Sequence, residues 1–133
     1  MSEYFMIDLF AGAGCLSCGL ELAGFTPVLA NELVDQYAHT YHINHHDTKV
    51  IVGDVRQVDE KELHSLIKEY GEIDLIAGGP PCQDFSMNAP VRTLDDPRNH
   101  LFKEFLRIVA DIKPKAVVIE KYQALYLLEK EQL

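Results

Sequence analysis

The sequence predicts a single α/β domain in which a doubly wound, mostly parallel sheet carries helices on both faces. Its apolar runs are short and continuous, alternate with helical patterns of roughly ten residues, and are followed by glycines at several ends. Continuous apolar runs are typical of parallel strands, because helices cover both faces of the sheet. Ligands of this fold class bind outside the carboxyl ends of the strands, near the point where the strand order reverses.

Five apolar runs predict the strands: Tyr4–Phe10, Thr26–Ala30, Val50–Val52, Ile73–Ala77 and Ala116–Ile119. Helical patterns between and after them predict five helices: Leu16–Ala23, Gln36–Ile43, Leu63–Tyr70, Leu101–Ile112 and Gln123–Leu133. Gly24 and Gly71 stand where the first and third helices should end, because glycine suits the left-handed conformation at helix C-termini. Gly78–Pro81 ends the fourth strand abruptly, and a polar loop follows as far as Asn99.

Length and composition limit the class of protein. The chain has 133 residues, 47% of them hydrophobic and 25% charged, as in an ordinary globular domain. No apolar run approaches the roughly 20 residues that cross a bilayer, and the N-terminus lacks the pattern of a secretory signal. Three cysteines are an odd number for a disulfide framework. We therefore expect one soluble intracellular domain over residues 1–133.

The charge balance is acidic. Twelve Lys and Arg residues stand against 21 Asp and Glu residues, which gives a formal net charge of −9. Proteins that grip nucleic acid unaided usually present a basic face, whereas the basic residues here are scattered. If the chain works on DNA, most of the phosphate-binding surface lies elsewhere.

The glycine-rich segment Ala11–Gly14 directly follows the first strand. Glycines at such a turn let the backbone approach a ligand closely, and the following helix N-terminus attracts negative charge. Gly12 and Gly14 lack the third glycine of a full dinucleotide fingerprint, and a simple tight turn is the alternative. The position after a strand favours a cofactor loop.

Two carboxylates follow the second and third strands. Glu32, after Asn31, stands about 20 positions beyond the glycine turn, where an acidic residue can accept hydrogen bonds from ribose hydroxyls. The alternative is a carboxylate that satisfies the N-terminus of the next helix. Asp54, after Gly53, has the same two interpretations: it caps a helix or binds an adenine amino group.

The segment after the fourth strand carries a candidate nucleophile. Cys82 lies in a loop fixed by prolines and preceded by glycines, which favours an exposed thiol over the usual buried, inert cysteine. Glu120, at the end of the fifth strand, is expected beside this loop, with a structural ion pair as its alternative. A cysteine and a carboxylic acid converging on one site suggest nucleophilic attack with acid assistance.

Five segments together resemble successive motifs of the DNA (cytosine-5) methyltransferases: Asp8–Gly14 (DLFAGAG), Asn31–Glu32, Gly53–Asp54, Gly78–Ser86 (GGPPCQDFS) and Asp96–Phe102 (DPRNHLF). Their order and spacing match that family from residue 4 to about residue 120. The Pro-Pro-Cys-Gln run is highly distinctive.

The resemblance implies that S-adenosylmethionine lies across the strand ends. It places at the cofactor Phe10, Gly12, Gly14, Glu32, Leu33, Asp54, Val55 and Pro80. In this set Glu32 would hold the ribose hydroxyls, Leu33 would pack on the adenine, and Asp54 would bind the adenine amino group.

The resemblance also assigns the catalytic pair. Cys82 would attack carbon 6 of a cytosine flipped out of double-stranded DNA, for which it must be a thiolate. Glu120 would contact N3 of that base and favour its protonation as the adduct forms. Carbon 5 then becomes nucleophilic and takes the methyl group, and loss of the carbon 5 proton releases the enzyme.

Two residues depart from the family pattern. Cys15 stands where the family commonly has another glycine. Lys121 follows Glu120 where an asparagine usually helps to orient the cysteine loop. The lysine either aids the thiolate by its positive charge or leaves the loop misplaced.

Compared with the family, the chain stops just after the fifth strand, before the arginine-bearing motif, the target-recognition domain and the final helical motif. We expect a complementing chain with a target-recognition domain, or self-association through a sheet edge left unpaired. Such a partner would account for the acidic charge. The style of the motifs implies a bacterial or phage-encoded cytoplasmic protein, associated with the nucleoid when it works.

Two other patterns have simpler interpretations. Cys15 and Cys18 have the spacing of a redox pair at a helix start, but the resemblance to a cofactor loop explains their surroundings better. Four histidines lack the further ligands of a metal site and are interpreted as a solvated helix end: His39, His42, His45 and His46. The nearby Tyr37, Tyr41 and Ile43 are expected to be core or half-buried. No metal and no membrane partner is expected.

Two classes of function stay open. The intact Cys82 and Glu120 favour an enzyme, or an enzyme subunit, that methylates cytosine in DNA. Lys121 and the absent C-terminal motifs favour a non-catalytic relative that binds the cofactor or a partner.

Overall fold

The computed structural model describes residues 3–81, 100–121 and 124–129, and within them it confirms the predicted doubly wound α/β fold. The strands are β1 (Tyr4–Leu9), β2 (Phe25–Glu32), β3 (Lys49–Val52), β4 (Leu75–Gly78), β5 (Ala116–Lys121) and β6 (Ala124–Glu129). The helices are α1 (Cys15–Leu22), α2 (Asp35–Asn44), α3 (Glu60–Tyr70) and α4 (His100–Ile112), with one short 3₁₀ helix, η1 (Val55–Gln57).

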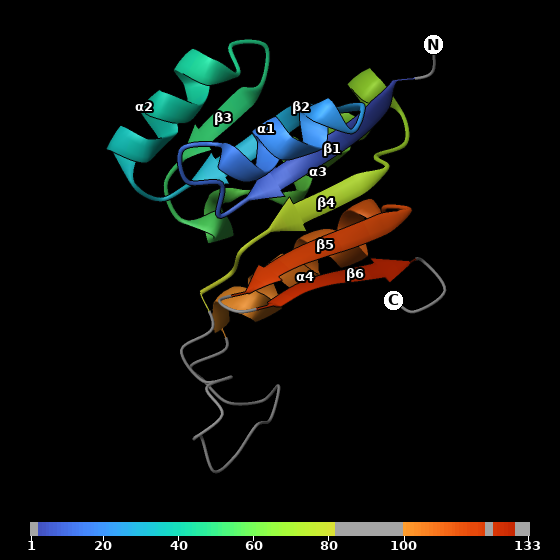
Figure 1. The fold of residues 1–133 in the computed structure, drawn as a ribbon. Coiled ribbons are helices and arrows are strands. Elements are labelled where there is room, and N and C mark those ends of the chain that lie inside the picture. The colour runs from blue at the N-terminus through green and yellow to red at the C-terminus, as the bar shows by residue number, and fades with distance from the viewer. Residues whose placement is uncertain (1–2, 82–99, 122–123, 130–133) are drawn as a thin grey trace.

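The sheet has the strand order β3-β2-β1-β4-β5-β6, and its first five strands run parallel (Figure 1). The chain builds outward from β1 through β2 to β3, then crosses to the other side of β1 to form β4 and β5. The order therefore reverses between β1 and β4, whose residues Leu9 and Gly78 are register partners. Ligands of such sheets bind outside this point.

Helices cover both faces of the sheet, α1 and α2 on one and α3 and α4 on the other (Figure 1). Successive side chains of a strand point to opposite faces, so Met6 of β1 belongs to the cluster on the α1 face. Its neighbour Ile7 belongs to the larger cluster with Leu63 of α3 and Ile108 of α4. Each of these four side chains is almost fully buried, and burial of such a side chain stabilises the fold by roughly 1.5–3 kcal/mol.

The predicted helix ends after α1 and α3 are confirmed. Gly24 has φ 98° and Gly71 has φ 80°, both in the left-handed region that favours glycine. At its other end α3 is capped by Asp59, whose side chain accepts a 2.8 Å hydrogen bond from the Glu62 amide.

The C-terminal prediction is wrong. The segment expected to be a helix over Gln123–Leu133 contains β6, which pairs antiparallel with β5 from Ala116 opposite Glu129 to Lys121 opposite Ala124. Alanine, leucine and glutamate favour a helix. The backbone of β5, however, offers hydrogen-bond partners to a neighbouring strand, and this pairing outweighs the helix propensity of the segment. The prediction that the fifth strand is an unpaired edge is therefore wrong, because β5 pairs with β4 on one side and with β6 on the other. Self-association of the chain stays a prediction.

In the described ranges, none of the helices combines the length and the hydropathy that a bilayer crossing requires.

Candidate functional site

A cavity of about 320 Å³ lies at the carboxyl edge of the sheet, walled by the segments that follow β1, β2, β3 and β4. Six of the residues predicted at the cofactor line it: Phe10, Gly12, Glu32, Leu33, Asp54 and Val55. Its volume lies in the range of small-molecule sites, about 300–1,000 Å³. The structure thus gathers around one space six predicted cofactor residues that are up to 45 positions apart in the chain.

The other two predicted cofactor residues lie outside the cavity wall. Gly14 is the N-cap of α1, with φ 97°. Pro80 is buried, while its neighbours Gly79 and Pro81 line the cavity in its place.

The turn after β1 is fixed from β2. Phe10 has φ 56° and Gly12 has φ 58°, so two residues of this turn adopt the left-handed conformation. The Ala11 amide donates a 3.0 Å hydrogen bond to the carbonyl of Asn31. The Gly12 amide donates a 2.6 Å hydrogen bond to Oε2 of Glu32. These two hydrogen bonds fix the glycine turn to the end of β2.

Glu32 makes two local hydrogen bonds. Besides the Gly12 amide, its carboxylate accepts a 3.1 Å bond from the amide of Val34, the N-cap of α2. The interpretation of Glu32 as a carboxylate at a helix start is therefore observed. A carboxylate offers about four acceptor positions, so two remain for a ligand in the cavity that Glu32 lines.

Asp54 is engaged by Arg56. The carboxylate accepts hydrogen bonds from the Arg56 amide at 2.9 Å, from Nε at 2.8 Å and from an Nη atom at 2.7 Å. This side-chain partnership holds the pKa of Asp54 well below its usual range. Asp54 is thus the N-cap of η1, which is the capping alternative, and it stands at the cavity wall with its negative charge already partnered.

Asn31 is a site residue that the sequence arguments named without a role. Its Nδ2 donates to the carbonyl of Ile51 at 2.8 Å and to that of Gly53 at 3.0 Å. The side chain, 2% exposed, thereby ties the end of β2 to the segment that carries Asp54. The sequence feature that could have predicted this role is the position of Asn31, a polar amide directly after a predicted apolar strand.

Glu120 lies beside the loop after β4, as predicted. Gly79 packs so closely that a Cβ there would stand 3.3 Å from the Glu120 backbone oxygen and 3.8 Å from its Oε2. The Glu120 side chain is exposed. Cys82 lies outside the described residues, as does the loop to Asn99; the last described residue before it, Pro81, lines the cavity.

Asp8, at the end of β1, is buried beneath this edge and 1% exposed. Its Oδ2 accepts a 2.6 Å hydrogen bond from the Ser17 hydroxyl, whereas its Oδ1 has no hydrogen-bond partner among the described residues. The pKa of Asp8 is raised to about 6, chiefly by burial and to a smaller extent by the charges of Glu120 and Glu32, while the Ser17 bond and the nearby His45 act in the opposite direction.

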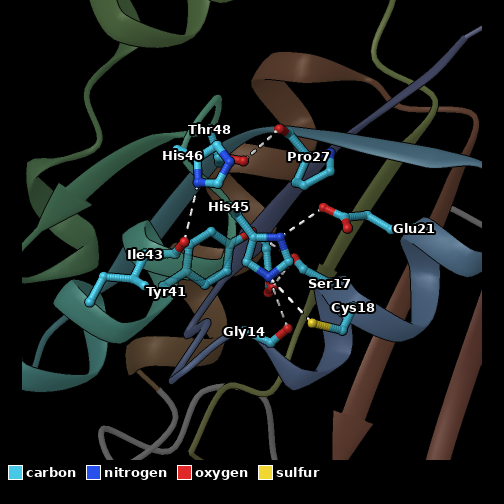
Figure 2. A network of polar contacts seen from close by, with 11 residues as sticks. Gly14, Ser17, Cys18, Glu21, Pro27, Tyr41, Ile43, His45, His46 and Thr48 are labelled. Atoms are coloured by element: carbon cyan, nitrogen blue, oxygen red, sulfur yellow. Dashed lines mark hydrogen bonds and ion pairs between the residues drawn. The ribbon is translucent and has the colours of Figure 1, made fainter.

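Ser17, the partner of Asp8, belongs to a polar network between α1 and the end of α2 (Figure 2). The hydroxyls of Ser17 and Tyr41 lie 2.7 Å apart, and burial raises the pKa of Tyr41 above its ordinary value. The ring of His45 stacks obliquely on Tyr41, with centroids 4.5 Å apart. Its Nδ1 lies 2.7 Å from a Glu21 carboxylate oxygen, and its Nε2 faces Cys18 and Gly14.

The interpretation of the four histidines needs one correction. His45 is buried, 5% exposed, because the end of α2 packs its ring against α1; the solvated interpretation is wrong for this residue. His39, His42 and His46 are exposed. Across the part of the chain that the structure describes, no three His, Cys, Asp or Glu side chains are placed to hold a metal ion.

The expected burial of the neighbouring apolar residues is confirmed only for Tyr41, which is fully buried. Tyr37 is 53% exposed and Ile43 is 58% exposed, so the prediction of burial is wrong for both. Tyr37 instead lines the cavity.

Comparison with known proteins finds type II methyltransferases among the similar proteins. Type II methyltransferase M1.HphI of Haemophilus parahaemolyticus is 43% identical over 122 residues, which are 90% of this chain and 32% of that protein. Type II methyltransferase M.AquIA of Picosynechococcus sp. is 39% identical over 121 residues, 90% of this chain and 49% of that protein. The chain thus spans about a third to a half of the length of these curated relatives.

A solved structure agrees. A crystal structure described as a DNA modification methyltransferase encoded within a prophage (E. coli) superposes with a TM-score of 0.74 at 34% identity, covering 90% of this chain and 32% of that one. The family model described as C-5 cytosine-specific DNA methylase matches residues 4–132. With the matching fold and strand-end cavity, this places the chain in the family of C-5 cytosine-specific DNA methylases.

Proposed function

We propose that this protein transfers a methyl group from S-adenosylmethionine to carbon 5 of cytosine in double-stranded DNA. One observation carries the proposal: the strand-end cavity joins the glycine turn and Glu32 to Gly79 and Pro81, and a Cβ on Gly79 would lie 3.8 Å from Oε2 of Glu120. Cys82 follows Pro81 directly in the sequence. Family membership supplies the reaction type.

The residues around the cavity fit S-adenosylmethionine. Glu32 keeps acceptor positions for the ribose hydroxyls, and Leu33, 67% exposed, offers an apolar surface to the adenine. Asp54 would accept from the adenine amino group in addition to Arg56, and Phe10, Gly12 and Val55 would complete the wall. Gly14 and Pro80 would not contact the cofactor directly and would instead fix the backbone of the segments that line the cavity. When bound, S-adenosylmethionine supplies an electrophilic methyl group.

The chemical steps would fall to Cys82 and Glu120. Cys82, as a thiolate, would bond to carbon 6 of a cytosine flipped from the duplex, since the base is out of reach inside the stack. Glu120 would hold the base at N3 and favour its protonation, which leaves carbon 5 nucleophilic. After methylation, loss of the carbon 5 proton would expel Cys82. Because Glu120 is exposed, it is open to a base that enters from solvent.

DNA binding would need positive charge from another source. The net charge of −9 repels phosphates. We infer that residues 1–133 act as the cofactor and catalytic-loop part, and that a basic target-recognition part, in a complementing chain or elsewhere in the protein, contacts the duplex. The working complex would then lie in the bacterial cytoplasm at the nucleoid.

Cofactor binding is tested by titration calorimetry with S-adenosylmethionine. We expect saturable binding that Glu32→Ala weakens by roughly tenfold or more, because hydrogen bonds to a charged group contribute about 1.5–3 kcal/mol. Glu32→Gln should retain more affinity, since its carbonyl still accepts a hydrogen bond. Glu60→Gln, on the exposed face of α3, is the matched control and should bind as the unchanged chain does. A folded chain that does not bind S-adenosylmethionine would contradict the proposed pocket.

Catalysis is tested by transfer of a labelled methyl group to duplex DNA, for the chain alone and with a candidate complementing chain. Cys82→Ser should lower transfer by about a thousandfold or more, because loss of a covalent nucleophile removes the main route. Cys15→Ser is the control cysteine and should not lower it to that extent. Cofactor binding without transfer in any combination would favour the alternative, a cofactor-binding protein that performs no chemistry.

A further inference from the structure

Cys18, His45 and Glu21 form a chain of contacts between α1 and the residue that follows α2 (Figure 2), and none of the three lines the strand-end cavity. The Cys18 thiol lies 3.6 Å from Nε2 of His45, and Nδ1 of the same ring lies 2.7 Å from Oε1 of Glu21. The His45 side chain is 1% exposed and that of Glu21 is 42% exposed. A thiol, an imidazole and a carboxylate in this order are the arrangement that activates a nucleophilic cysteine.

The hydrogen-bond partners of the His45 imidazole determine which of its two nitrogens carries the hydrogen. An ionised Glu21 only accepts hydrogen bonds, so Nδ1 of His45 carries the hydrogen in this contact. In the neutral ring Nε2 is then an acceptor without a hydrogen, and it faces the thiol of Cys18. His45 is thereby oriented to take the thiol proton.

The carbonyl of Gly14 favours the product of that proton transfer. It lies 3.3 Å from Nε2, and as an acceptor it can bond Nε2 only when this nitrogen carries a hydrogen. Once the proton has moved, Nδ1 donates to Glu21 and Nε2 donates toward the Gly14 carbonyl and the thiolate. The contacts of His45 are therefore all satisfied when Cys18 is a thiolate.

A second cysteine stands one helical turn away. Cys15 is the first residue of α1 and Cys18 the fourth, and both are exposed and free thiols. Residues at this spacing have Cβ atoms about 5–6 Å apart on a helix, whereas a disulfide requires about 3.5–4.5 Å. A small tightening of the first turn of α1 would close the bond.

We propose that Cys18 is a base-activated thiol that reacts with hydroperoxides, and that Cys15 resolves it to a disulfide. The Cys18 thiolate attacks the peroxide oxygen, the O–O bond breaks, and the leaving alkoxide takes the proton from His45, which gives an alcohol and a sulfenic acid. The Cys15 thiol then attacks the Cys18 sulfur, the S–O bond breaks, and water leaves with the Cys15 proton. Two thiols are oxidised, and one hydroperoxide is reduced to one alcohol and one water.

The primary sequence makes the reaction easy to follow. The chain has no Lys or Arg before Lys49, so one tryptic peptide holds both Cys15 and Cys18, while Cys82 lies on a different one. After exposure of the reduced chain to hydrogen peroxide, we expect the first peptide to lose the mass of two hydrogens. In Cys15→Ser a cyclic 1,3-diketone should trap sulfenic acid at Cys18; in Cys18→Ser it should trap much less at Cys15.

The role of the ring is tested by rates. His45→Gln and Glu21→Gln should each slow the oxidation of Cys18 by about tenfold or more, since positioned bases contribute factors of about 10²–10⁴. His46→Gln is the matched control, because this exposed neighbour contacts only the Ile43 carbonyl among its described hydrogen bonds. Circular dichroism checks folding, and if His45→Gln fails to fold, the half-exposed Glu21 carries the test. Equal rates in the unchanged chain and Glu21→Gln, or equal trapping at Cys15 and Cys18, would overturn the proposal.

Discussion

Asp8 lies near the end of β1 and Asp54 follows β3, at the same edge of the sheet, yet their surroundings shift the pKa values of their carboxyl groups in opposite directions. Asp8 is buried with one side-chain partner and one bare oxygen, which raises its pKa to about 6. Asp54 stands at the cavity rim, where Arg56 holds its pKa well below the usual range. The comparison shows that depth and partners, rather than residue type or strand position, set the charge at each point of this site.

The sharpest test of this contrast is the pH dependence of stability in Asp8→Asn. In the folded chain Asp8 binds its proton up to about pH 6, against 3.8 ordinarily, so the folded state holds more protons than the unfolded state between these values. The contribution of Asp8 to stability is therefore lost as the pH rises from about 4 to about 6. Asn has no proton to lose over this range. The free energy of unfolding of Asp8→Asn, relative to that of the unchanged chain, should therefore rise by on the order of 2–3 kcal/mol between pH 4 and pH 7.

Urea unfolding of both proteins at the two pH values measures this difference. When the free energies of unfolding of the two proteins are subtracted at each pH, the contributions of the carboxylates that both contain, Asp54 among them, cancel. Parallel pH profiles for the two proteins would show that Asp8 is ionised in the folded state, as Asp54 is.

A smaller effect is expected when Asp8 loses the hydrogen bond from Ser17. Ser17→Ala removes the hydroxyl that donates to Asp8 and contacts Tyr41, so it should lower the free energy of unfolding by about 1–3 kcal/mol at pH 7. It should also move the midpoint of the pH profile for Asp8 upward, since that bond lowers its pKa. Chemical denaturation across the same pH range provides both values, with Ser65→Ala on the exposed face of α3 as the control. A Ser17→Ala protein as stable as the control variant would contradict this account.

The smallest effect on stability is expected at Asp54. Arg56→Gln removes the guanidinium that is paired with Asp54 at the surface, and such exposed pairs contribute little. The melting temperature should stay almost unchanged, while the pKa of Asp54, followed by NMR, rises toward its ordinary value. A large loss of stability would mean that the rim is as tightly coupled to the fold as Asp8.

The parts of the fold that sequence predicted are those set by local patterns. The apolar strands and the glycine ends of α1 and α3 depend on residues within a few positions of one another. β6 could not be predicted this way, because its residues favour a helix until β5 offers them backbone partners. The strand ends brought Glu32 and Asp54 to the cavity as expected, since parallel strands end at one edge.

His45 shows why the rest of the site stayed hidden. Its sequence neighbours are polar and exposed, and its burial follows only from α2 lying beside α1, 31 positions after Gly14. Ser17 carried a faint signal, as a polar residue among the apolar ones of the first helix, yet its partner Asp8 is nine positions back across a turn. Contacts of this kind arise from packing and have no short-range pattern.

The position of β1 at the centre of the sheet has a consequence for how the chain folds. β1, β2 and β3 are contiguous over residues 4–52 and lie side by side, so this half of the sheet can assemble from contacts of modest sequence separation as the chain leaves the ribosome. β4 pairs with the other edge of β1 only after some 70 residues have been made, as in the pair Met6 and Leu75. Until then that edge of β1 stands exposed, and the nascent half-sheet is the stage at which a chaperone or a second copy of the chain would find an open strand.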